Sequence, residues 1–250
     1  MPSRYEVIGI AGLPEITRGD DLAPFIADAA ARQGTPLLRG DLLVVSQKIV
    51  SKTEGRVVQL SSITPSPTAL AVAEETGRDP RLTAVILGES RRIVRKDKGV
   101  LIVETHHGFI CANAGVDQSN VDADTACLLP EDSDRSARAL RDRLRDITGH
   151  ALAVIIADTF GRPWREGLTN VAVGVAGFSP LKSYLGELDP AGHVLQATII
   201  ALADELASAA EPAMGKLDRV PVVIIRGLEW EPAEGSSQAL LRDPARDLFR

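Results

Sequence analysis

A carboxylate and a hydroxyl follow one apolar run directly, at Asp158 and Thr159. The run LAVIIA, residues 152–157, has the length and composition of a buried strand. Ligand crevices in open sheets lie beyond the carboxyl ends of strands, and side-chain oxygens there suit Mg²⁺ or Mn²⁺. The pattern therefore favours a cation site at Asp158 and Thr159, while the simpler alternative is that Asp158 caps a turn.

Two arginines and a tryptophan follow the same strand, at Arg162, Arg165 and Trp164. Guanidinium groups near a carboxylate suit the recognition of phosphates or of acidic substrates. The alternative is a solvated basic face. Trp164 is equally suited to stacking on a ligand ring or to covering an interface.

Short polar side chains are concentrated in the segment CANAGVDQSNV, residues 111–121. This composition is typical of a turn whose Asn, Asp and Ser side chains satisfy their own backbone. It is also typical of a ligand loop in which Asp117 binds a metal, with Ser119 and Asn120 nearby. If this loop meets Asp158, the two carboxylates form a paired metal site.

Lysines occur in two places where they could hold phosphates. Lys48 and Lys52 follow the apolar strand 42–45, although a lone lysine pair is more often a solvated edge. Lys216 follows Met214 and Gly215, but the full Walker A spacing is absent. A nucleotide site in this chain therefore has no common phosphate-loop or dinucleotide fingerprint.

A structural role is the favoured interpretation of the adjacent histidines His106 and His107. Neighbouring residues of a strand point to opposite faces, so the two rings are poorly placed to share one ion.

Composition limits the class of protein. The chain has 250 residues, of which 44% are hydrophobic and 25% are charged, and its formal net charge is −6. An acidic chain is a poor partner for nucleic acid. Two cysteines without metal-type spacing, no secretion signal and no long apolar run indicate reduced thiols, a cytoplasmic location and no membrane association.

The order of strands and helices predicts an α+β fold with a mixed sheet, rather than a doubly wound parallel sheet. We expect a single domain over residues 1–250, with two lobes and an irregular segment around 161–189. Strands are expected at 5–10, 42–45, 91–95, 100–104, 108–111, 152–157, 171–175 and 222–225. Helices are expected at about 21–32, 67–76, 80–87, 132–147 and 198–214. The expected starts of the first four are marked by Asp20 or Asp21, Ser66, Asp79, and Asp132 or Ser133, and Gly149 marks the end of the fourth.

Several segments together resemble the coenzyme F420-0:gamma-glutamyl ligases. They are GLPEI, GDLLVVSQKIVSKTEGRVV, DPRLTAVILGES, HHGFICANAGVDQSNV, IIADTFGRPWREG and ADELASAAEPAMGK, which run in family order from residue 12 to residue 216. The fourth and fifth are the most specific, and the ending DLFR is also similar.

The resemblance implies an enzyme that uses GTP and a divalent cation to join L-glutamate to coenzyme F420-0. GTP would phosphorylate a carboxylate to an acyl phosphate, the amine of glutamate would form an amide, and later glutamates would add through gamma links. GDP and phosphate would be released. An unusual α+β fold and an intertwined homodimer are also implied.

Site residues are carried over from the family by position. The implied cation ligands are Asp117 for one cation, Asp158 shared or close by, and Thr159 for a second. The divalent cations would be Mg²⁺ or Mn²⁺, as many as two per site, with K⁺ as a further cation. The implied nucleotide contacts are Leu13, Pro14, Glu15, Ile16, Gln47, Lys48, Lys52, Asn120, Met214, Gly215 and Lys216. We add Arg162 and Arg165 to Asp117 and Asp158 as the catalytic group, holding the acidic substrates.

Two other functions fit the same side chains. A metal-dependent phosphohydrolase would use the carboxylates with water as the nucleophile, and would release phosphate without glutamate. A silent metal-binding or nucleotide-binding module would bind without turnover.

Overall fold

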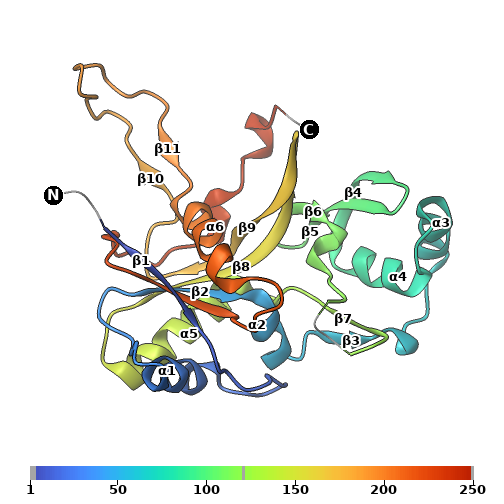
Figure 1. Ribbon diagram of the computed structural model, residues 1–250. Coiled ribbons are helices and arrows are strands. Elements are labelled where there is room, and N and C mark those ends of the chain that lie inside the picture. Colours follow the sequence, from blue (N-terminus) through green and yellow to red (C-terminus); the bar gives the residue numbers. More distant parts are fainter. Residues whose placement is uncertain (1–3, 120–121, 249–250) are drawn as a thin grey trace.

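The computed structural model describes residues 4–119 and 122–248. Its centre is a five-stranded sheet in the order β1–β12–β2–β8–β9 (Figure 1). The strands are β1 (Glu6–Ile10), β2 (Leu42–Ser46), β8 (Ala153–Arg162), β9 (Arg165–Ala176) and β12 (Val222–Arg226). Strands β2 and β8 run parallel, and the other neighbours are antiparallel. The predicted α+β class with a mixed sheet is therefore confirmed.

Helices cover both faces of this sheet (Figure 1). Helices α1 (Leu22–Arg32) and α5 (Ser133–Thr148) pack on one face, where the apolar side chains of β2 include Leu43 and Val45. Helix α6 (Leu202–Met214) packs on the other face, against Leu42 and Val44. Alternate residues of β2 thus enter different cores, and because both faces are buried the strand reads as a continuous apolar run.

A third core lies beside the sheet, in residues 57–128. Its elements are β3 (Val57–Gln59), α3 (Pro67–Thr76), α4 (Pro80–Gly88), β4 (Ser90–Asp97), β5 (Val100–Thr105), β6 (Ile110–Ala112) and β7 (Thr125–Cys127). Leu101, Val103 and Ile86 are fully buried within it. The connection from β6 to β7 carries the polar loop around Asp117, so this core positions that loop.

Capping residues set the helix starts as predicted. Asp21, Ser66, Asp79 and Asp132 each accept a backbone N–H of the first turn, and Gly149 ends α5 in the left-handed conformation. Helix α2 (Gln47–Thr53) was not predicted, because its seven residues are too few to show a clear helical period. It begins directly where β2 ends.

The expectation of an irregular segment around 161–189 is wrong over the first half of that range. Strands β8 and β9 form one long hairpin that turns between Arg162 and Arg165. Residues 165–168 are exposed, so this end of β9 lacks the apolar alternation by which a strand is recognised. Beyond β9, the short strands β10 (Lys182–Ser183) and β11 (Ile199–Ile200) pair at the base of a projecting arm (Figure 1).

Four 3₁₀ helices complete the described elements: η1 (Leu60–Ser62), η2 (Asn113–Gly115), η3 (Ser237–Leu240) and η4 (Pro244–Arg246). Within residues 4–119 and 122–248, none of the helices combines the length and apolar character that a bilayer span requires.

Candidate active site

The carboxyl ends of the two parallel strands bring Lys48 and Asp158 together. The last pair between β2 and β8 is Ser46 with Ala157, so Lys48 and Asp158 follow at the same edge of the sheet. Asp158 was expected after the end of its strand, but β8 continues to Arg162 by pairing with β9 alone. A register shift between Ile156 and Ala157 marks the change. Bulges of this kind re-aim side chains next to functional sites.

Asp117 reaches the same place from the third core. Its backbone pairs with that of Cys127, and its carboxylate lies 2.7 Å from the ammonium of Lys48. The backbone N–H and the hydroxyl of Ser119 donate to the carboxylate, each at 2.8 Å. Burial alone would raise the pKa of Asp117, but the hydrogen bonds from Lys48 and Ser119 outweigh it and hold the pKa below its ordinary value.

Asp158 has the opposite electrostatic environment. Burial, together with the negative charge of Asp117, raises the pKa of Asp158 to about 6, although Lys48 and Lys216 act in the other direction. The charge of Asp117 acts on Asp158, and both carboxylates act on Cys127, so the Asp117 loop and the Asp158 strand lie near each other. A carboxylate that is difficult to ionise beside a second carboxylate is a place where a cation binds favourably.

The donor set suits a cation that shares its coordination with a substrate. Among the described residues, no group of three or more His, Cys, Asp or Glu side chains could hold a metal ion. Mg²⁺ commonly takes one or two carboxylates and completes its shell with water and substrate phosphates. The pair Asp117 and Asp158 therefore fits one such cation, bound together with a phosphorylated ligand.

The pH dependence of cation binding follows from this environment. Below pH 6, Asp158 is protonated in the metal-free protein while Asp117 stays ionised, so a cation must displace one proton. We expect the apparent affinity for Mn²⁺ to fall about tenfold for each pH unit below about 6. Titration calorimetry between pH 5 and pH 8 measures this, and an affinity that stays flat from pH 5 to pH 7 would contradict it.

Both thiols near this centre are free and buried, as expected for reduced cysteines. Burial and the charge of Asp158 raise the pKa of Cys111 to about 12, and burial raises the pKa of Cys127 to about 11. The thiols therefore stay protonated at neutral pH and do not compete as thiolate ligands.

Thr159 belongs to a closed ring of four side chains. Its hydroxyl donates to Asn170 Oδ1 at 2.7 Å, and Asn170 Nδ2 donates to Glu211 Oε2 at 2.8 Å. Glu211 Oε1 lies 2.7 Å from the Lys216 ammonium, which donates to Thr159 Oγ1 at 2.8 Å. The ring ties the β8–β9 hairpin to the end of α6.

The side chains expected to hold a nucleotide lie around the same edge of the sheet. Lys52 is on α2, one turn beyond Lys48, and its ammonium lies 2.6 Å from Glu15 Oε1. That hydrogen bond and the charge of Lys52 lower the pKa of Glu15. Gln47 is fully buried, its Oε1 accepts from the Ser51 hydroxyl, and its Nε2 has no hydrogen-bond partner among the described residues.

Several of the other predicted nucleotide contacts pack against the hydrophobic cores, and one lies outside the described residues. The side chains of Ile16 and Met214 are 5% exposed and belong to the hydrophobic cores, and Leu13 packs against the same core as Ile16. Pro14 is exposed in the same turn. Asn120 lies outside the described residues.

The two arginines lie apart from the carboxylates, at the tip of the β8–β9 hairpin. Arg162 is four residues beyond Asp158 along the strand, or about 13 Å at the rise of a strand. Its guanidinium donates to the backbone carbonyls of Glu166 and Gly167 in its own hairpin. Arg165 is exposed, and Trp164 is 80% exposed with a positive φ of 57°. Their predicted role toward acidic substrates stays a prediction.

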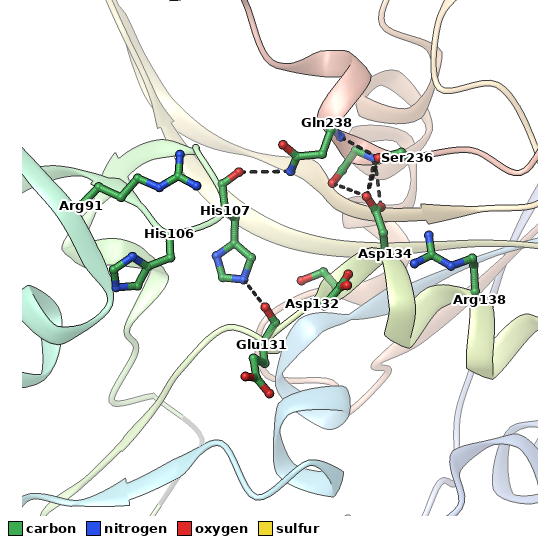
Figure 2. A pocket seen from close by; sticks show the side chains of 11 residues that line it. Arg91, His106, His107, Glu131, Asp132, Asp134, Arg138, Ser236 and Gln238 are labelled. Carbon is green, nitrogen blue, oxygen red and sulfur yellow. Dashed lines mark hydrogen bonds between the residues drawn. The ribbon is translucent and has the colours of Figure 1, made fainter.

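A separate cavity of about 410 Å³ lies between the two histidines and the start of α5 (Figure 2). His106 Nε2 contacts the carbonyl of Gly88 at 2.9 Å, and His107 Nε2 contacts that of Pro130 at 2.8 Å. Asp134 accepts from Ser236 and from Ser237, which attaches the C-terminal segment. These contacts support the structural reading of the histidine pair.

Sequence reasoning missed Asn170 and Glu211. Asn170 is 4% exposed within the otherwise apolar end of β9, and Glu211 lies on the largely apolar α6. A polar side chain on a buried strand needs a hydrogen-bond partner, so Asn170 was a detectable signal. Its partner comes from 41 residues away in the chain, which local patterns do not reveal.

A family model and several relatives match this chain, and their names agree with one another. The family model described as F420-0:Gamma-glutamyl ligase matches residues 11–227. The chain is 49% identical over 247 residues to the coenzyme F420:L-glutamate ligase of Methanothermobacter thermautotrophicus, covering 98% of each chain. It is 48% identical over 241 residues to the Methanopyrus kandleri protein of that name, covering 94% of each chain. It is 40% identical over 248 residues to the Methanocaldococcus jannaschii protein of that name, covering 99% of this chain and 97% of the relative.

Proposed function

Because the chain belongs to the F420-0:gamma-glutamyl ligase family, we propose that it joins L-glutamate to coenzyme F420-0 through an amide bond, at the expense of GTP. Further glutamates add through gamma links. The observation that carries the proposal is the meeting of Asp117, Asp158 and Lys48 at the carboxyl ends of two parallel strands.

The first step transfers the γ-phosphoryl group of GTP to the carboxylate of the acceptor. A carboxylate oxygen forms a bond to phosphorus as the bond to the β-phosphate oxygen breaks, which gives an acyl phosphate and GDP. Little covalent help from the protein is needed, because the transferred group requires mainly positioning and neutralisation of charge. Lys48, beside Asp117, and Lys52, one helical turn further along α2, are the ammonium groups that supply it.

Asp117 and Asp158 would hold a divalent cation, Mg²⁺ or Mn²⁺, which would reduce the negative charge on the reacting phosphate group. Asp158 must lose its proton to bind the cation, and burial opposes this ionisation. The hydrogen bonds from Ser119 fix the orientation of Asp117.

The second step forms the amide. The neutral amine of glutamate attacks the carbonyl carbon of the acyl phosphate, the bond to the phosphate oxygen breaks, and inorganic phosphate leaves. Arg162 and Arg165 are our candidates for holding the carboxylates of glutamate or of the growing tail. The two-lobed shape, the intertwined homodimer, the K⁺ ion and the cytoplasmic location are further predictions of this account.

Transfer of oxygen tests the acyl phosphate directly. F420-0 whose reacting carboxylate carries ¹⁸O is incubated with GTP, Mg²⁺ and glutamate, and the phosphate released is analysed by mass spectrometry. We expect one ¹⁸O per phosphate, because the bond that breaks in the second step leaves the carboxylate oxygen on phosphorus. Unlabelled phosphate whose release does not need glutamate would instead indicate the phosphohydrolase.

A further inference from the structure

A lysine ammonium lies where the family pattern places a second cation. Thr159 was expected to bind such a cation, but its hydroxyl oxygen accepts a hydrogen bond from Lys216 Nζ at 2.8 Å. A hydroxyl ligand would hold a divalent cation at roughly 2.1 Å. The cation and the ammonium would then share one oxygen, and their like charges would repel each other at this short distance.

The nearby acidic group is already engaged by the same lysine. Glu211 has its Oε1 atom 2.7 Å from Lys216 Nζ, and its Oε2 atom accepts from Asn170 at 2.8 Å. Asn170 in turn accepts the proton of the Thr159 hydroxyl, so the acceptor orbitals of that oxygen face the lysine. The ring is complete without a metal ion.

The turn at the end of α6 places this lysine beside Thr159. Gly215 follows the helix with φ 59° and ψ −175°, a conformation that is open essentially to glycine alone. A Cβ atom there would lie 2.3 Å from a carboxylate oxygen of Asp218. The chain therefore turns sharply at Gly215 and directs Lys216 back onto Thr159.

Lys216 also lies close to the first cation site, because its hydrogen-bond partner Thr159 directly follows Asp158 on β8. We propose that the Lys216 ammonium replaces a second divalent cation, so that each chain binds a single Mg²⁺ or Mn²⁺, at Asp117 and Asp158. This inference rests on the proposed function, because the fixed positive charge acts on the phosphates of bound GTP. A lysine supplies a single charge with rotatable donors, which suits this task.

Counting bound Mn²⁺ tests the inference without relying on turnover. The whole protein is saturated with a non-hydrolysable GTP analogue, and free Mn²⁺ is followed by electron paramagnetic resonance during titration. We expect one tightly bound Mn²⁺ per chain in the wild type. Lys216→Glu, which exchanges the ammonium for a metal-ligating carboxylate, is expected to bind two, and Lys216→Gln is the milder variant.

Lys98→Glu is the matched control, because Lys98 lies in the exposed turn between β4 and β5, and it should bind one Mn²⁺. Lys216 has a 59% exposed side chain, so its replacement should be tolerated by the fold. Two tightly bound Mn²⁺ per wild-type chain would overturn the inference and leave the ligase proposal standing. A single Mn²⁺ in both Lys216 variants would also overturn it. Absence of tight Mn²⁺ binding in the wild type would overturn the Asp117–Asp158 cation site, and with it both proposals.

Discussion

Replacing Asp158 by asparagine is expected to lower the rate of glutamate ligation by about 1,000-fold or more, the scale seen when a main electrostatic group of an active site is lost. The substitution removes one of the two carboxylates that meet at the sheet edge and keeps the shape of the side chain. Steady-state release of phosphate, in the presence of F420-0 and glutamate, measures the effect.

The same substitution is expected to stabilise the metal-free protein. Burial raises the pKa of Asp158 from 3.8 to about 6, so the folded state binds this proton more tightly than the unfolded state. The resulting stability is present at pH 4 and is lost as the pH rises to about 6. Above pH 6 the ionised carboxylate costs on the order of 2 kcal/mol, since one pKa unit corresponds to about 1.4 kcal/mol and the group is partly exposed.

Asparagine avoids this cost, so the Tm of the variant should exceed that of the wild type by about 5 °C at pH 7.5 and by little at pH 4. Asp204→Asn is the control, because burial also raises the pKa of Asp204, which lies on α6, accepts from the backbone N–H of Ala172 and is not influenced by Asp117 or Asp158. The control should keep its activity. A fully active Asp158→Asn enzyme would refute the role given to Asp158.

Replacing Lys48 by methionine is expected to have opposite effects on the nucleotide and on the metal. Lys48 lies 2.7 Å from Asp117 and also lowers the pKa of Asp158. Without nucleotide at pH 8, its removal frees Asp117 from an ammonium and should strengthen Mn²⁺ binding about tenfold, a fraction of the roughly 4 kcal/mol between unit charges 4 Å apart near a protein surface.

With GTP present, turnover should fall about 100-fold or more, because an ammonium no longer neutralises the phosphates. Lys52→Met is the matched comparison on the same helix. Lys52 pairs with Glu15 and not with Asp117, so this variant should raise the KM for GTP and leave the nucleotide-free affinity for Mn²⁺ unchanged. Weaker Mn²⁺ binding in Lys48→Met would show that Lys48 supports the metal site rather than competing with it.

Much of the fold follows from local chemistry that the sequence displays. Apolar runs such as residues 42–45 and 152–157 gave the central strands, and Asp21, Asp132 and Gly149 gave the helix ends, because capping depends on residues close in sequence. The β8–β9 hairpin was predicted in part only. Its outer half leaves the core and carries no apolar period.

The candidate site, like the fold, was predicted only in part. Asp117, Lys48 and Asp158 were each visible as polar groups at the ends of apolar segments, but only the packing of the third core beside the sheet shows that they meet. The ring around Thr159 was not predictable, because Asn170 and Glu211 are joined by a contact between distant segments. The hydrogen bond from Lys216 to Thr159 likewise depends on the turn at Gly215.

Mass-resolved turnover tests the central claim most directly. The purified protein is mixed with F420-0, L-glutamate, GTP and Mg²⁺ or Mn²⁺, beside the Asp158→Asn variant, and the deazaflavin products are analysed by mass spectrometry. The account predicts products heavier by whole glutamyl units, formed only with both GTP and glutamate and lost in the variant. Phosphate release without any glutamyl product, or product formation that Asp158→Asn leaves intact, would contradict it.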